Sequence, residues 1–400
     1  MTDKYLVEPD VGFIKEVVGL GGGDLKKCFQ CATCSVVCPI SPDNKPFPRK
    51  EMIAASWGLK DRLVGNGDIW LCHNCGDCST MCPRGAKPGD VLGAIRSYAI
   101  ADYATPKFLG KAVSDPKKLP ILLLIPAVIF MIAAYITTNF SEALTNTFGE
   151  LWSHGVQADM IAPANFISTW FVDMVFVPLA LWVVVILGLG IKRFLADIHA
   201  DAVLHGKTDK EKIDPQGFIL ALVRVIPIIL KHSKFNECSE NKERSTAHLL
   251  VFYGFVGLFV VTNIFFIALY LMHSPGPYSQ INPVKWLANI AGVALIAGGF
   301  LMIKNRLSKE DQVNSYVDWY LIGLVLGLGL TGMLTEITRL AGLGSVSYFI
   351  YYLHLICVFM LFAFLPFSKL AHIVYRTVAM AYAEYSGRGF IVDPKKETER

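Results

Sequence analysis

Charge is scarce in this 400-residue chain: Asp, Glu, Lys and Arg make up 18% of it, whereas hydrophobic residues make up 53%. With a mean hydropathy of +0.45, the composition is too apolar for a soluble protein of this length. No secretory signal stands ahead of the first cysteine, so a disulfide framework is not expected. The glycine cluster at 19–23 is not followed by G-K-[S/T], which disfavours a phosphate loop and favours a hinge, and no nucleophile or acid–base pair for hydrolysis is evident.

Eight of the ten cysteines stand in two copies of one spacing, C-x2-C-x2-C-x3-C, and proline follows each copy. This is the spacing of bacterial ferredoxins, in which three thiolates of one run and the last thiolate of the other hold each [4Fe-4S] cluster. Structural zinc, the main alternative, uses paired C-x2-C knuckles and explains two runs of four less well. By the ferredoxin rule, one cluster is held by Cys28, Cys31, Cys34 and Cys82, and the other by Cys72, Cys75, Cys78 and Cys38.

The first 118 residues are polar and carry both cysteine runs, so they form a predicted head domain. Asp24 is expected to cap the turn that leads into the first run. A second amphipathic helix over 88–103 is expected to close over the head. A helix is also predicted over 49–64, with four residues facing inward: Met52, Ile53, Trp57 and Leu63.

Six apolar segments follow, and each reaches the length of about 20 residues needed to cross the hydrocarbon core of a bilayer. They are Leu119–Thr138, Ile167–Ile191, His248–His273, Val284–Ile303, Trp319–Leu340 and Ser347–His372. The predicted fold is therefore all-α, with a small two-cluster ferredoxin domain followed by a six-helix transmembrane bundle. Its domains are a head (1–118), a membrane body (119–372) and a tail (373–400).

Positive charge concentrates on one side of these segments. The loop 192–247 carries ten Lys and Arg and the chain after His372 carries five, whereas the loops 139–166 and 274–283 carry none. Positively charged loops stay on the cytoplasmic side of a membrane. The head and both termini are therefore expected in the cytoplasm, and the chain in the inner membrane.

Histidines at the ends of the apolar segments predict haem. His248 opens the third segment and His372 closes the sixth, so this pair is expected at matched depth, as ligands of one b haem. His354 stands 18 residues before His372, about 27 Å further out on a continuous helix. It is expected to ligate a second haem, with His273 or His232 as its partner.

Several other polar residues lie in the apolar segments or in the loops between them. Asp173 in the second segment, and Glu336 with Arg339 in the fifth, are candidates for a quinone site, for neutralising haem propionates, or for a structural ion pair. The remaining residues of interest are expected to be surface histidines (His154, His199 and His205), a reduced loop thiol (Cys238) and a small apolar core residue (Cys357).

Two stretches carry a family resemblance. The head resembles the two-cluster subunit of heterodisulfide reductases, above all from Asp24 to Pro39. The body is similar to the di-haem b membrane subunits of the nitrate reductase gamma type, through the sequence AHLLVFYGF around His248 and through the histidine pair at the chain's last segment. A fusion of the two resembles the C subunits of quinone-interacting membrane-bound oxidoreductase complexes of sulfate-reducing bacteria. The resemblance covers nearly the whole chain.

The resemblance implies a subunit that links menaquinone to flavin and iron-sulfur partner subunits, which exchange electrons with adenylylsulfate reductase. The gamma pattern has a further histidine on an early helix, where this chain has Leu258 ten residues after His248. That departure makes His232, in the stretch HSKFNEC, a rival to His273. Two alternatives remain: a membrane subunit of another heterodisulfide-reductase-like complex, or a cluster-gated membrane sensor or transporter without haem.

Overall fold

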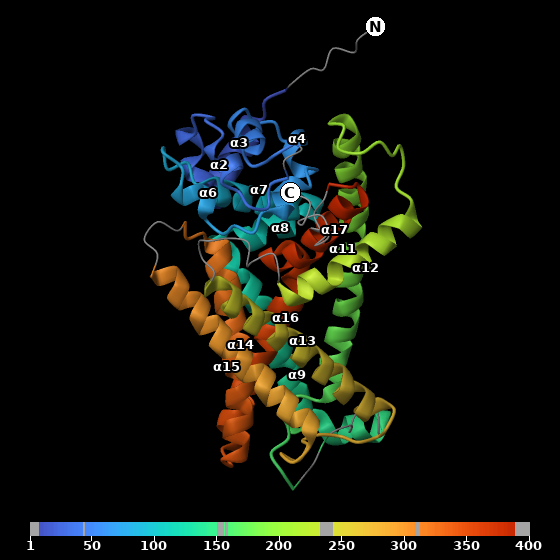
Figure 1. The fold of residues 1–400 in the computed structure, drawn as a ribbon. Helices are drawn as coiled ribbons and strands as arrows, with labels where there is room; N and C mark the ends of the chain where they lie inside the picture. The colour runs from blue at the N-terminus through green and yellow to red at the C-terminus, as the bar shows by residue number, and fades with distance from the viewer. Residues whose placement is uncertain are drawn as a thin grey trace.

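The computed structural model describes residues 8–42, 45–149, 156, 159–232, 243–308 and 313–388. Within these ranges the regular structure is helical and no strand is present, which confirms the predicted all-α class. A head of short helices lies at one end of a bundle of long helices (Figure 1). The head contains α1 (Val11–Val17), α2 (Thr33–Val36), α3 (Arg49–Ser56), α4 (Asp61–Val64), α5 (Asp68–Leu71), α6 (Asp77–Thr80), α7 (Pro88–Tyr103) and α8 (Lys107–Ser114).

Of the local predictions for the head, the helix over 88–103 has the predicted bounds. The prediction of a single helix over 49–64 is wrong, because the helix is interrupted between α3 and α4 at Gly58, whose φ of +69° is left-handed. Trp57 is exposed at this break, whereas Met52 and Leu63 are buried. Asp24 is not a cap: it lies inside a 3-10 turn (Gly23–Lys27) and pairs with Lys27 at 2.6 Å.

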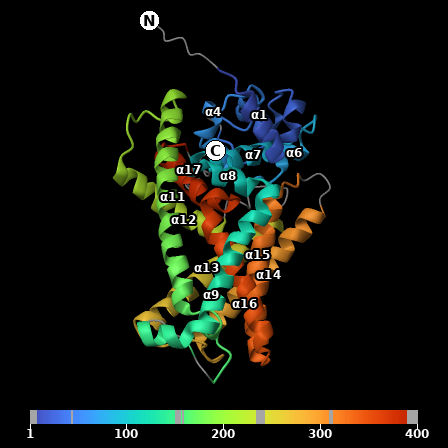
Figure 2. The ribbon, with the colours of Figure 1, turned by 180° about the vertical axis from the view of Figure 1, so that it is seen from behind.

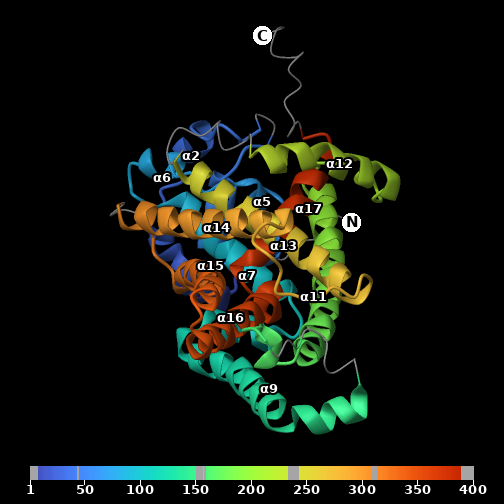
Figure 3. The same cartoon turned by 90° about the horizontal axis from the view of Figure 1, so that it is seen from below.

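Six helices of the described chain are long and apolar enough to cross a membrane, as predicted. They lie in α9 (Leu119–Phe148), α11 (Thr169–Leu204), α13 (Glu243–Tyr270), α14 (Pro283–Leu307), α15 (Tyr316–Leu340) and α16 (Gly344–Phe364). Seen from below, α9 runs along one edge of the bundle beside α16, with α13 and α14 towards the other side (Figure 3). Added Cβ atoms at Gly254 and Gly257 would lie 3.0 Å from the Ala291 carbonyl oxygen and 2.8 Å from the Ala291 Cβ, so these glycines allow α13 and α14 to pack closely.

Two predicted boundaries in the body are wrong. The loop expected over 192–247 contains the end of α11 and a further helix, α12 (Pro215–Lys231). The sixth segment does not run on to His372, because α16 ends at Phe364 and the chain turns at Pro366, which cannot continue a helix. His372 instead begins α17 (His372–Tyr385), so His354 and His372 lie on different helices and the single-helix spacing of about 27 Å does not apply.

The first part of the predicted tail, residues 373–385, belongs to α17 and packs against the head. Tyr375 of α17 is buried in the core of the head, where it stacks on Trp70 with ring centroids 5.3 Å apart. Phe194 of α11 packs edge-on against the same Tyr375 at 5.5 Å. From behind, α11 and α17 rise beside the head helices (Figure 2). The head is therefore built on the ends of the body helices and shares one core with them.

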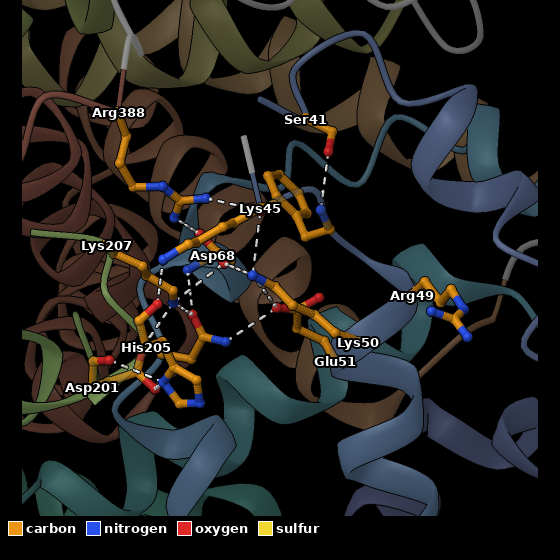
Figure 4. Close-up of polar contacts among 12 residues, drawn as sticks. Ser41, Lys45, Arg49, Lys50, Glu51, Asp68, Asp201, His205, Lys207 and Arg388 are labelled. Atoms are coloured by element: carbon orange, nitrogen blue, oxygen red, sulfur yellow. Dashed lines mark hydrogen bonds and ion pairs between the residues drawn. The ribbon is translucent and has the colours of Figure 1, made fainter. Parts of the chain in front are cut away.

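A buried ion network joins the same parts. Asp68 of α5 is fully buried and pairs with Lys207 at 3.4 Å, with Lys50 at 3.1 Å and with Arg388. Lys207 also pairs with Asp201 at 2.8 Å. These side chains converge from the head, the end of α11 and the C-terminal segment (Figure 4). Because buried charges are costly without partners, the network fixes the head in one position on α11.

Candidate functional site

Both cysteine runs fold into the same local structure. In each run the backbone N–H two residues after the first cysteine donates to its sulfur, from Gln30 to Cys28 at 3.4 Å and from Asn74 to Cys72 at 3.3 Å. Both donors have left-handed φ, and a second left-handed residue, Ala32 or Gly76, then begins a short helix that carries the third cysteine. A tight turn of this kind brings three sulfurs together, which a cluster face requires.

The thiols form two groups that mix the runs. Burial raises the pKa of Cys34 to about 11, and its other causes include the nearby thiols of Cys28, Cys31 and Cys82. Burial raises the pKa of Cys38 to about 12, with Cys72 and Cys75 as neighbours. Cys82 is thus near a thiol of the first run and Cys38 is near thiols of the second run, and the exchange of ligands between the runs stays a prediction. We call these the first group (Cys28, Cys31, Cys34 and Cys82) and the second group (Cys38, Cys72, Cys75 and Cys78).

Each group consists of four cysteine thiols, the donor set of a [4Fe-4S] cluster. In the described residues, no group of three or more His, Cys, Asp or Glu side chains is arranged to hold a single metal ion. The donor set of each group is compatible with a [4Fe-4S] cluster, and the assignment of individual ligands stays a prediction.

The two groups differ in exposure. Cys31 of the first group is exposed, and the apolar side chains nearby, Phe29 and Val36, are 69% and 83% exposed. In the second group Cys72 and Cys78 are each only 8% exposed. The first group therefore lies near the outer surface of the head, and the second lies deeper.

Three arginines, one from the head and two from later helices, bind the second cysteine run. Arg96 of α7 donates to the carbonyl oxygen of Cys72 at 2.6 Å, and Arg376 of α17 donates to the same oxygen at 3.2 Å. Arg244 of α13 donates to the carbonyl oxygen of Asn74 at 2.9 Å. Sequence reasoning missed this arginine cluster; its only local signal is that Arg244 stands four residues before His248, and Arg376 four residues after His372.

Three histidines meet directly behind these arginines. The rings of His248 and His372 are 6.3 Å apart between centroids, at an interplanar angle of 76°. The His372 Nδ1 lies 2.6 Å from the Lys369 carbonyl oxygen, and the His248 Nδ1 lies 2.8 Å from the His232 Nε2. The Nδ1 atoms of both rings are therefore within hydrogen-bonding distance of a partner. Burial lowers the pKa of His372 to about 3, which keeps its imidazole neutral.

The spacing and chemistry of this histidine pair suit a haem. His248 and His372 would hold it, and their ring centroids are 6.3 Å apart. A hydrogen bond from Nδ1 to a carbonyl is the usual support for a ligating histidine. Arg244, Arg376 and Lys369 supply positive charge near the pair, as carboxylate side groups of a haem require.

Among the described residues, the contacts of the other histidines show no second pair of facing imidazoles. His354 is directed at α15, where its Nδ1 lies 3.0 Å from the Thr331 Oγ1, and in the described part of the chain it pairs with this hydroxyl rather than with an imidazole. His232 lies with His248, and His273 is exposed in the loop after α13. The structure thus gives no support to either proposed partner of His354.

Of the residues expected at the surface, His199 bonds Tyr382 at 2.7 Å and so joins α11 to α17, whereas His205 pairs with Asp201 at 3.0 Å within the end of α11. Cys357 packs at the edge of a core cluster of the bundle, as expected. His154 and Cys238 lie outside the described residues.

The quinone-site candidates are engaged in polar pairs. The Tyr270 hydroxyl donates to Asp173, joining α13 to α11. Glu336 forms an ion pair with Lys285 of α14 and accepts a hydrogen bond from Gln280 at 2.6 Å. Lys285 was not singled out in the sequence. Arg339 is near enough to act on the charge of Glu336, but the direct ion pair of Glu336 is with Lys285.

Comparison with known proteins identifies the cysteine-bearing region. The family model of the 4Fe-4S dicluster domain matches residues 24–86. No curated protein and no solved structure gives a significant match to the chain. Residues 24–86 therefore form a 4Fe-4S dicluster domain, and the chain joins this domain to a bundle of membrane-spanning helices.

Proposed function

We propose that the chain is the membrane subunit of a quinone-interacting oxidoreductase, and that it carries electrons between a quinone and a redox partner at the head. The observation that carries the proposal is the histidine pair, 6.3 Å apart between ring centroids, beside the second cysteine run. A bound b haem would supply one-electron chemistry there. His248 and His372 would hold it, and Arg244, Arg376 and Lys369 would neutralise its carboxylates.

The residues near the far ends of the helices suit proton transfer. Oxidation of one quinol to quinone releases two electrons and two protons. The electrons leave singly towards the clusters, while the protons pass to water through carboxylates. Glu336, balanced by Lys285, and Asp173, bonded to Tyr270, are the candidates for that role. Electron flow in the opposite direction consumes two electrons and two protons per quinone.

The kind of quinone and the partner subunits are inferred from the sequence resemblance. We infer that the quinone is menaquinone and that the head passes electrons to flavin and iron-sulfur subunits that serve adenylylsulfate reductase in sulfate reduction. The positive charge of the loops on the head's side supports our proposal that the head lies on the cytoplasmic face of the inner membrane. A membrane subunit of another heterodisulfide-reductase-like complex has the same parts, and co-purification of the partner subunits distinguishes the two.

The test is haem and iron analysis of the full chain, purified anaerobically from membranes. The wild type is expected to give b-type bands after dithionite reduction, a positive pyridine haemochrome, and about eight non-haem irons. His248→Ala and His372→Ala should lose the same haem and keep the non-haem iron. His199→Ala, with a histidine outside the pair, is the control and should keep both.

A wild-type chain without b-type bands contradicts the proposal and favours the sensor or transporter alternative. The matching test of the second haem is His354→Ala: if this variant keeps all haem, His354 is not a ligand.

A further inference from the structure

We infer that the two clusters work in a fixed order: the second group's cluster exchanges electrons with the membrane body through the arginine cluster, and the first group's cluster is the exit to the partner. This inference rests on the proposed function. Arg376 is the positioning residue on which the order depends, because it contacts the second cysteine run from the helix that His372 begins.

The contacts of Arg376 join the two redox sites over a short stretch of chain. Its guanidinium donates to the carbonyl oxygens of Cys72 and Leu71, at 3.2 and 3.4 Å, and lies 2.6 Å from the His73 Nδ1. Arg376 stands one helical turn after His372 on α17. A single turn of helix therefore separates a proposed haem ligand from a backbone group of a cluster ligand.

The arginines also act on the charge of the second cluster. Arg96 and Arg376 share the carbonyl oxygen of Cys72, and Arg244 binds that of Asn74, so three guanidinium groups surround one face of this cysteine run. Reduction adds a negative charge to a cluster. Nearby positive charge favours the reduced form and raises the reduction potential, and the buried setting strengthens the effect.

The first group lies in different surroundings. Arg49 donates to the Gln30 carbonyl oxygen at 2.9 Å, and the Arg84 guanidinium stacks on Phe29, 4.1 Å from the ring centroid. Phe29 and Cys31 are exposed, and so is Met81, next to Cys82, at 59%. Apolar side chains with flanking arginines around the exposed thiol form the face at which an acidic redox partner would receive electrons.

The first experiment measures cluster potentials in the full chain by redox titration followed by electron paramagnetic resonance. Arg376→Gln is expected to lower the equilibrium constant for reduction of the second cluster about tenfold, or about 59 mV for one electron. Arg376→Lys keeps the charge and should restore most of the difference. Arg84→Gln is the matched control near the first group and should leave the second cluster unchanged.

The second experiment tests the order itself. Cys82→Ser removes a ligand of the first cluster and Cys38→Ser removes one of the second. With menaquinol as reductant, the remaining cluster of Cys82→Ser should still be reduced, and the remaining cluster of Cys38→Ser should not. Equal reduction in both variants, or an Arg376→Gln shift shared equally by the two clusters, overturns the inference.

Haem content, measured in the same samples, separates this inference from the proposed function. If the chain holds no haem but Arg376→Gln still shifts the second cluster alone, the proposed haem site is wrong and the role of Arg376 in setting this cluster's potential stands.

Discussion

Replacing Lys207 with methionine is expected to loosen the head from the end of α11. The Lys207 side chain is 5% exposed and forms ion pairs with Asp68 at 3.4 Å and with Asp201 at 2.8 Å. The side chains of these two aspartates are 0% and 7% exposed. Methionine retains the length of the side chain and removes its charge. Both carboxylates would then lose a cation in a setting where water cannot replace it.

The size of the stability loss depends on which ion pairs the two carboxylates keep. Removing one partner of a buried ion pair costs about 3–5 kcal/mol when the other charge is left uncompensated. Here Asp68 keeps Arg388 and Lys50, and Asp201 keeps His205 at 3.0 Å. We therefore expect a loss of about 2–3 kcal/mol in the free energy of unfolding of the head. For a head of about 118 residues, that lowers the Tm by roughly 8–12 °C.

The assay is differential scanning calorimetry of the full chain in detergent, following the transition of the head. The control is Lys107→Met, because Lys107 pairs with Asp102 at 3.0 Å but is 60% exposed. An exposed pair contributes less than about 1 kcal/mol. Adding Asp201→Asn to Lys207→Met should cost less than the sum of the single changes. Equal shifts for the Lys207 and Lys107 variants would refute the reasoning.

Three further predictions concern the head, the bundle and the histidines. Burial and the neighbouring Asp68 raise the pKa of Glu51 to about 8. Between pH 4.5 and about 8 the folded head therefore binds more protons than the unfolded chain, so its free energy of unfolding should fall as the pH rises through that range. Thermal melts of Glu51→Gln should show a smaller fall. Gly257→Ala should lower the detergent Tm, because its Cβ would lie 2.8 Å from Ala291 Cβ, whereas Gly323→Ala, with nothing within 4 Å, should not. His232→Ala should keep the haem that His248→Ala loses, with a changed midpoint potential; loss of the haem would instead make His232 a ligand.

Much of the site was predictable because its signals are local. The spacing within each cysteine run determines the turn that gathers three sulfurs, and the length of each apolar segment determines that it spans a bilayer. The rings of His248 and His372 lie 6.3 Å apart, and their role as haem ligands stays a prediction. The single helix assumed for His354 and His372 was wrong, because α16 ends before Pro366 and His372 begins a new helix.

What the sequence by itself determined is therefore the dicluster domain, the six spanning helices and the all-α class, since each depends on residues close together in the chain. Only the tertiary structure decided that α17 completes the core of the head, that His232 supports His248, and that three arginines from α7, α13 and α17 meet at one cysteine run. The contacts of α17 with the head join residues far apart in sequence, for example 304 positions for Arg376 and Cys72. Such pairings depend on how the helices pack, which cannot be predicted from the spacing of residues along the chain.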